Sequence, residues 1–265
     1  YSESVWPAVV GAALALLTGL CIFGGVRRIS AITSGIVPVM AAIYIALGLF
    51  ITVKNIGQVP YMLSMIVSQA FDPKAMFAGI GASCIMQGIK RGLYSNEAGM
   101  GSTPHAHAMA KVEKPQDQGV VAMVCVFIDT FVVLTITALV MMNVGDMAAN
   151  PAAENMAQVA FSTVFGSFGN FYVAICLLFF AFSTIIGWYF FGEQNVKYLF
   201  GVKAVKVYAC IAVVCVALGA VLEAPLVWNL SDLFNALMVF PNLLALLALS
   251  GLVAKAARGG DALRK

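Results

Sequence analysis

The residues best suited to chemistry stand in one short stretch, residues 92–108, which reads GLYSNEAGMGSTPHAHA. It contains one carboxylate, Glu97, inside an otherwise apolar region. The amide and hydroxyl side chains around it are Ser95, Asn96, Ser102 and Thr103. The chain has neither a metal motif such as HExxH nor a nucleophile with a base, as a hydrolase would need. An ionisable group in such a setting indicates a binding site, and we expect no enzymatic activity.

Other titratable residues are open to more than one interpretation. His105 and His107 resemble a metal pair, but residues two apart point to different faces of a helix, and no second ligand cluster accompanies them. Lys90 and Arg91 either face a water-filled vestibule or pair with the carboxylate of the stretch. Asp129 is either a proton or ion relay, or a structural residue that caps a helix or pairs with a threonine.

The helix that carries this stretch should be broken. Two glycines and Pro104 interrupt it, so residues 95–103 are predicted to be non-helical. Thr103 is suited to cap a second half-helix that has proline at its first position and runs from Pro104 to about Val112. Unpaired backbone groups are costly in lipid, so such a break persists only where it lines a cavity or is buried in protein. The alternative is a proline kink that serves packing only.

Composition identifies the setting as a bilayer. Hydrophobic residues make up 62% of the 265 and charged residues 10%, against roughly half and a quarter in soluble domains. The net charge of +3 comes from basic clusters at helix ends, which argues against nucleic acid as a partner. Each of the six cysteines lies in an apolar stretch outside any CxxC pair, as expected of small hydrophobes on helix faces.

Apolar runs predict seven membrane crossings, the third of them broken. They lie near residues 5–24, 32–53, 77–112, 120–142, 168–190, 206–223 and 226–254. Two stretches, residues 55–74 and 151–166, are too polar or too short to cross, and we expect an amphipathic surface helix and an external loop helix there.

Basic residues predict the orientation, because cytoplasmic ends collect Lys and Arg. Alternate ends carry Arg27, Arg28, Lys111, Lys114, Lys197, Lys203, Lys206, Lys255, Arg258, Arg264 and Lys265. The opposite ends carry only two basic residues, Lys54 and Lys74, and four acidic residues are expected there without a basic neighbour: Asp146, Glu154, Glu223 and Asp232. Residue 1 is therefore expected outside and residue 265 in the cytoplasm. The chain opens without an initiator Met or a charged leader, so we expect an N-terminal part to precede it.

The 92–108 stretch closely resembles the signature of the alanine or glycine:cation symporter family. Two later stretches match the same family in the same order, STIIGWYFFGEQNVKYLFG (residues 183–201) and VWNLSDLFNALMVFPNLLALLALSG (residues 227–251). The resemblance implies an all-α polytopic membrane protein of the leucine-transporter type (APC superfamily), with two inverted five-helix repeats. Residues 1–265 would then be a single transporter domain lacking its first three helices, with the second repeat at about residues 73–254.

The resemblance also implies roles for site residues. It assigns aromatic contacts with the substrate to Tyr94 and Trp188. The other expected substrate-binding residues are Ser95, Asn96 and Glu97 at the break, and Thr184, which lies near Trp188.

A sodium site is expected at Ser183 and Thr184. These adjacent hydroxyls interrupt an apolar run, and Thr184 precedes Trp188 by four residues, on the same helix face. Hydroxyl oxygens suit a hard cation. Folds of the implied type supply such a pair to sodium, together with carbonyls of the first broken helix. The alternative is that both hydroxyls bond back to the carbonyl four residues earlier or join neighbouring helices.

The expected function is sodium-coupled symport of a small neutral amino acid, alanine or glycine, by alternating access across a prokaryotic plasma membrane. Sodium is the coupling ion, and no cofactor is expected. A proton-coupled transporter, or a channel-like or receptor membrane subunit, remains the alternative.

Overall fold

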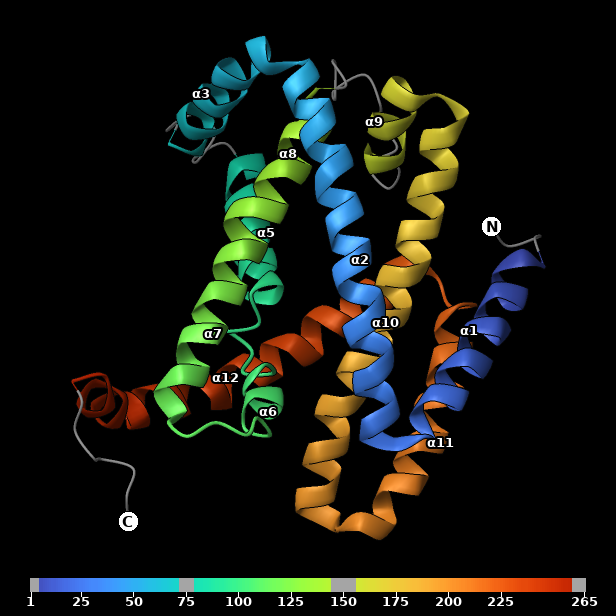
Figure 1. The fold of residues 1–265 in the computed structure, drawn as a ribbon, viewed down its shortest axis with the longest axis vertical. Helices are drawn as coiled ribbons and strands as arrows, with labels where there is room; N and C mark the ends of the chain where they lie inside the picture. The colour runs from blue at the N-terminus through green and yellow to red at the C-terminus, as the bar shows by residue number, and fades with distance from the viewer. Residues whose placement is uncertain (1–4, 72–78, 144–155, 259–265) are drawn as a thin grey trace. The chain divides into compact units, whose positions relative to one another are not determined.

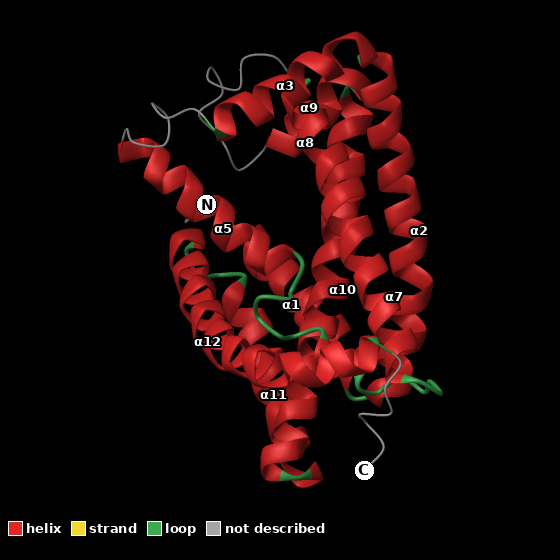
Figure 2. Cartoon of the chain, turned by 90° about the vertical axis from the view of Figure 1, so that its left-hand side faces the viewer, coloured by secondary structure: helices red, strands yellow, loops and turns green. Residues whose placement is uncertain are grey.

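The computed structural model describes residues 5–71, 79–143 and 156–258, and all regular structure in these ranges is helical (Figures 1 and 2). In chain order the helices are α1 (Trp6–Ile22), α2 (Gly25–Lys54), the 3₁₀ turn η1 (Ile56–Gln58), α3 (Val59–Ala70), α5 (Gly79–Ser95), α6 (Pro104–His107), α7 (Pro115–Phe127), the π-helical turn η2 (Ile128–Val133), α8 (Leu134–Met142), α9 (Met156–Phe165), α10 (Ser167–Phe200), α11 (Val202–Gly219) and α12 (Ala224–Ala257).

Within the described ranges, five helical segments are long and apolar enough to cross a bilayer. They are Gly25–Lys54, Pro115–Met142, Ser167–Phe200, Val202–Gly219 and Ala224–Ala257. The other two expected crossings fall on α1, which has 17 residues, and on the interrupted pair α5 and α6. The chain is thus an all-helical polytopic membrane protein.

The segment α7–η2–α8 departs from regular helix in its middle. Ile128–Val133 forms a π-helical turn that contains the acidic residue Asp129. Single π turns are rare and occur often at functional sites, because they free backbone groups and redirect side chains.

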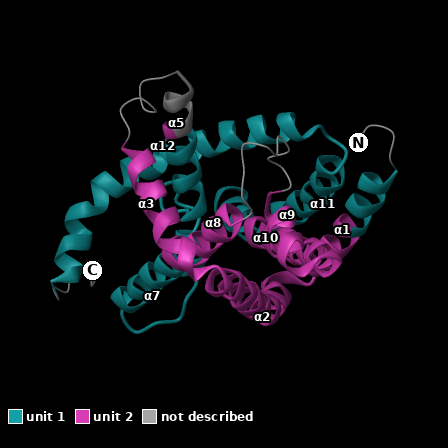
Figure 3. Cartoon of the chain, turned by 90° about the horizontal axis from the view of Figure 1, so that it is seen from above, with its two compact units in different colours: residues 1–13, 86–129, 190–265 teal, residues 14–85, 130–189 magenta. Residues whose placement is uncertain are grey.

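The chain divides into two compact units, coloured teal and magenta in Figure 3. Unit 1 comprises residues 1–13, 86–129 and 190–265, and unit 2 comprises residues 14–85 and 130–189. The units are interleaved in sequence, so α1, α5 and α10 each contribute residues to both.

Unit 2 is built around one aromatic core. Phe161 of α9 is fully buried, and its ring centroid lies 5.9 Å from that of Tyr44 and 5.5 Å from that of Tyr172. The Tyr44 hydroxyl reaches Thr137 Oγ1 at 2.7 Å.

The helix expected within residues 151–166 exists as α9, although residues 151–155 lie outside the described ranges. Its Ala160 and Phe161 are fully buried in the unit 2 core, and its place in an external loop stays a prediction. Most of the amphipathic stretch 55–74 is η1 and α3, where only Met62 is buried. Residues 72–74 lie outside the described ranges.

Candidate functional site

The break in the third predicted crossing is confirmed. Helix α5 ends at Ser95 and α6 begins at Pro104, with turns between them. Helix α6 ends at His107 and not at the expected Val112. Before the next helix, Lys114 is extended with φ −125° and ψ 129°, as favoured by a residue that precedes a proline. The second half-helix is therefore a single turn.

Glu97 organises the turn that follows α5. Its backbone is in the left-handed region, with φ 57°, which an L-residue with a side chain adopts at a cost. Its Oε2 atom accepts hydrogen bonds from the hydroxyls of Ser102 and Thr103, both at 2.9 Å. The prediction that the Thr103 side chain caps α6 is wrong, since the residue has helical dihedrals and its hydroxyl turns to Glu97. Proline at the first helical position is confirmed.

Backbone carbonyls of the break accept hydrogen bonds from amides of the turn itself and from a side chain of another helix. The Glu97 carbonyl accepts from the amides of Met100 at 3.1 Å and Gly101 at 2.9 Å. The next two carbonyls are bound by a distant residue: Asn242 of α12 donates from Nδ2 to Ala98 O at 2.8 Å and to Gly99 O at 2.9 Å. These bonds satisfy backbone groups that the break removes from the regular helical pattern.

Gly101 lets α12 approach the break this closely. Its φ is 74°, and a Cβ built at this position would lie 2.3 Å from Asn242 Oδ1. No L-residue with a side chain fits without displacing the amide of Asn242. Beside it, Ser102 is fully buried.

Ser95, the last residue of α5, connects the break to the fourth predicted crossing. Its hydroxyl donates to Asp129 Oδ2 at 2.8 Å. Asp129 therefore pairs with a serine, and neither expected structural role, a helix cap or a threonine pair, is observed. In the described ranges, no Lys, Arg or His nitrogen lies within 4.0 Å of its carboxylate. Asn96 accepts from the Ala98 amide through Oδ1 at 3.0 Å, an Asx turn that shapes the break.

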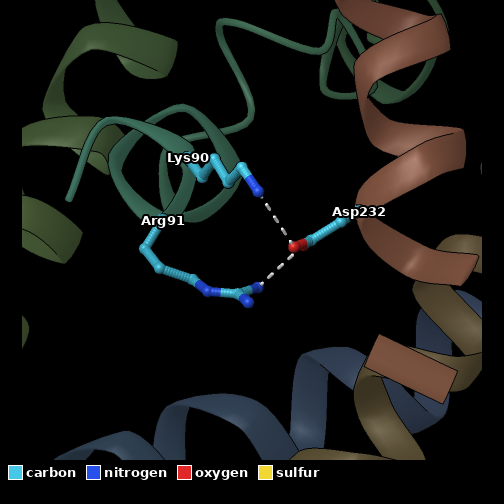
Figure 4. Close-up of polar contacts among 3 residues, drawn as sticks. All are labelled: Lys90, Arg91 and Asp232. Carbon is cyan, nitrogen blue, oxygen red and sulfur yellow. Dashed lines mark ion pairs between the residues drawn. The ribbon is translucent and has the colours of Figure 1, made fainter. Parts of the chain in front are cut away.

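Lys90 and Arg91 do not pair with Glu97, the carboxylate considered from the sequence, but with Asp232. Figure 4 shows both side chains of α5 reaching Asp232 of α12, Lys90 Nζ at 3.6 Å from Oδ2 and Arg91 Nη1 at 3.3 Å from Oδ1. The guanidinium of Arg91 also lies over the ring of Trp228, 4.6 Å from its centroid. The expectation that Asp232 belongs to an outer helix end without a basic neighbour is corrected: it lies within α12 and has two.

A cavity of about 220 Å³ lies beside this ion pair and the break. Its polar lining consists of Lys90, Tyr94, Asp232 and Asn235. Most of the remaining wall is apolar and includes Leu93 and Met100. Tyr94, the expected aromatic contact for the substrate, therefore lines a partly open cavity of modest size.

The other expected site residues belong to unit 2, in α10. Ser183 donates to Phe180 O at 3.1 Å, so its hydroxyl bonds back to its own helix. Thr184 is exposed and Trp188 half-buried. The break residues and the Ser183–Trp188 turn thus stand on different units.

The two histidines bind polar neighbours. His105 contacts Ser102 O through Nδ1 at 2.8 Å and Asn195 Oδ1 through Nε2 at 3.2 Å, and His107 Nδ1 lies 2.6 Å from Gln118 Nε2. Across the described part of the chain, His, Cys, Asp and Glu side chains nowhere gather in threes as a metal site would need.

Three residues of the site were missed in the sequence: Asp232, Asn235 and Asn242. All are polar residues in an apolar helix, at positions i, i+3 and i+10, which fall on one face. A polar stripe on a membrane helix marks a face turned to protein or water, and that signal was available.

Comparison with known proteins identifies the family of the chain. The model of the sodium:alanine symporter family matches residues 2–261. The sodium/alanine symporter AgcS of Methanococcus maripaludis is 40% identical over 265 residues, covering 98% of this chain and 58% of that protein. The probable sodium/glutamine symporter GlnT of Bacillus subtilis is 38% identical over 247 residues, covering 92% of this chain and 52% of that protein.

A third relative, the sodium/proton-dependent alanine carrier protein of Bacillus sp. (strain PS3), is 35% identical over 260 residues, covering 91% of this chain and 58% of that protein. The chain thus spans somewhat more than half the length of these curated relatives. Because the family model covers nearly all of it, the chain belongs to the sodium:alanine symporter family.

Proposed function

We propose that the complete protein containing this chain is a sodium-coupled symporter that carries a small neutral amino acid, alanine or glycine, across the plasma membrane by alternating access. Family membership and the names of the relatives support sodium coupling and an amino-acid substrate. The names of the relatives mention different amino acids, alanine and glutamine. The proposed preference for a small amino acid therefore rests on the sequence resemblance.

The observation that carries the proposal is the break between α5 and α6. Its turn is held by Asn242 from α12, and Tyr94 before it lines a cavity of about 220 Å³. Interrupted helices with polar turns build substrate and ion sites in secondary transporters, because unwound backbone offers groups that a continuous helix hides. We assign the substrate site to Tyr94, Ser95, Asn96 and Glu97, with Thr184 and Trp188 of α10 completing it.

The sodium site is assigned to Ser183 and Thr184. Two adjacent hydroxyls in an apolar helix suit a hard cation, and the family resemblance implies further oxygens from the carbonyls of a first broken helix. The bond from Ser183 to Phe180 O would open when sodium binds.

The fold is proposed to be the inverted-repeat type of the leucine transporter, in one transporter domain. Seven crossings would be present, with the second repeat at about residues 73–254, residue 1 outside and residue 265 in the cytoplasm. The count of basic residues at alternate helix ends supports this orientation.

Proton coupling is the second candidate, and one observation favours it. Asp129 stands in an apolar span with a serine hydroxyl on its carboxylate. Its charge would be costly there without a proton or a cation. One relative is named as dependent on sodium and protons.

The test is uptake by the purified complete protein in liposomes. Radiolabelled L-alanine, glycine and L-glutamine are offered with an inward sodium gradient, an inward proton gradient, or neither. Sodium symport predicts that the amino acid accumulates inside the liposomes only when the sodium gradient is present. Exchange of external labelled amino acid for internal unlabelled amino acid (counterflow) would exclude a channel. Uptake that depends on the proton gradient alone would show that protons, and not sodium, are the coupling ion. Binding without uptake would indicate a receptor subunit.

A further inference from the structure

His105 in α6 lies between two oxygen atoms that can only accept hydrogen bonds. Its Nδ1 atom is 2.8 Å from the carbonyl oxygen of Ser102, and its Nε2 atom is 3.2 Å from Oδ1 of Asn195 in α10. A second contact sets the orientation of the Asn195 amide, because its Nδ2 atom donates to the carbonyl oxygen of Phe191 at 2.9 Å. The amide oxygen is therefore the atom that faces the ring.

These contacts indicate which form of the ring is present. A neutral imidazole has one donor nitrogen and one acceptor nitrogen, whereas the imidazolium donates from both. A neutral His105 would place a nitrogen lone pair against one of its two oxygen partners. Only the imidazolium satisfies both contacts, so the described arrangement is that of the charged ring. Histidine is the side chain whose charge ordinarily changes between about pH 5 and 8.

His107, two residues later, has the opposite arrangement. Its Nδ1 atom lies 2.6 Å from Nε2 of Gln118, an amide nitrogen that can only donate. The Nδ1 atom of His107 is therefore an acceptor, as in a neutral ring. The two histidines thus differ in what a proton does to them: it completes the contacts of His105 and breaks the contact of His107.

The charged groups on the neighbouring elements leave His105 to its two oxygen partners. In the break, the carboxylate of Glu97 already accepts hydrogen bonds from two hydroxyls. On α10, Glu193 and Lys197 stand two residues before and after Asn195, and residues two apart point to different faces of a helix. The amide oxygen of Asn195 is therefore the group that α10 offers to the ring.

From these contacts we propose that His105 is a proton-dependent latch between the α5–α6 break and α10. The charged ring ties the carbonyl of Ser102 to the amide of Asn195. Loss of the proton sets an acceptor against an acceptor at one of the two contacts, so the latch opens. The stability that it supplies is present at low pH, where the ring is charged, and is lost as the pH rises. The latch does not depend on what the protein carries, and only its effect on the rate of uptake rests on the proposed function.

A double-mutant cycle tests the latch in the complete protein in detergent, without an amino acid. Unfolding temperatures are measured for the wild type, His105→Gln, Asn195→Leu and the double variant at about pH 5.5 and about pH 8.5, on either side of the range in which histidine changes charge. At the lower pH, the loss in the double variant should fall short of the sum of the single losses by about 2 °C, because a shared contact is removed only once. At the higher pH, the losses should add.

The matched control is the same cycle with His107→Gln in place of His105→Gln, and its losses should add at both pH values. Additive losses in the His105 cycle at both pH values would overturn the latch. A shortfall of equal size at both would also overturn it, since the contact would then not depend on the proton. If His105→Gln does not elute as one peak in gel filtration, His105→Asn takes its place with the same expected results. Because the cycle needs no amino acid, a protein that shows the shortfall at low pH but carries none would support the latch and contradict the proposed symport.

Discussion

Asn242 Nδ2 donates a 2.8 Å hydrogen bond to the carbonyl oxygen of Ala98, 144 residues earlier in the chain. The bond joins α12 to the turn between α5 and α6. A carbonyl bound in this way is satisfied and hidden from ligands, so a movement of α12 would change which backbone groups the break exposes. Asn242 is therefore a positioning residue for the proposed substrate site.

Replacing Asn242 tests this role. Asn242→Ala removes the donor shared by two carbonyls, and we expect the free energy of unfolding to fall by about 1–3 kcal/mol. Amino-acid uptake should fall as well, because the break loses its external support. Thermal unfolding in detergent and uptake in liposomes measure the two effects.

Ser250→Ala is the matched control in the same helix, since the Ser250 hydroxyl donates to Leu247 O of its own helix, at 2.8 Å. It should leave stability and uptake nearly unchanged. Equal effects from both variants would show that Asn242 has no special part in the break.

Gly101→Ala should be more damaging than an ordinary glycine substitution. The φ of 74° disfavours any L-side chain by about 1–2 kcal/mol, and the new methyl would strike the Asn242 amide. We expect reduced uptake and a lower unfolding temperature. Gly88→Ala in α5 meets no atom within 4 Å and should be neutral or stabilising. A Gly101→Ala protein as stable and active as the Gly88→Ala protein would refute the close approach of α12.

Local features of the site followed from the sequence, and its long-range contacts did not. Glycines and Pro104 predicted the interruption to within one residue, because backbone preferences are set by the residues themselves. The partner of Lys90 and Arg91 was not predictable, since Asp232 and Glu97 are equally good carboxylates and only the packing of α5 against α12 selects one. Similarly, hydropathy found α9 but could not show that Phe161 is buried beneath aromatic neighbours.

Trp188→Ala tests the assigned wall of the substrate site. A smaller side chain should relax size selectivity while the polar contacts remain, because an apolar pocket discriminates by about 1–3 kcal/mol for each methylene group. Competition of L-alanine uptake by L-valine and L-leucine measures this. We expect both to become stronger competitors. Unaltered exclusion of the larger amino acids, with normal alanine uptake, would remove Trp188 from the site.

The sodium assignment makes a separate prediction. Ser183→Ala and Thr184→Ala should each raise the sodium concentration for half-maximal uptake about fivefold, the equivalent of about 1 kcal/mol for one lost ligand. Expression and maximal uptake should change little. Ser162→Ala, another helix hydroxyl that bonds back to a carbonyl, is the control. An unchanged sodium dependence in both variants would place the ion elsewhere, with Glu97 and Asp129 the next candidates.

The most direct test of sodium-coupled symport is the entry of radioactive sodium into liposomes that contain the complete protein, with and without external L-alanine. The account predicts that alanine stimulates sodium entry, that sodium stimulates alanine entry, and that the two fluxes keep a fixed ratio as either concentration varies. Alanine entry that carries no sodium, at any sodium concentration, would contradict it.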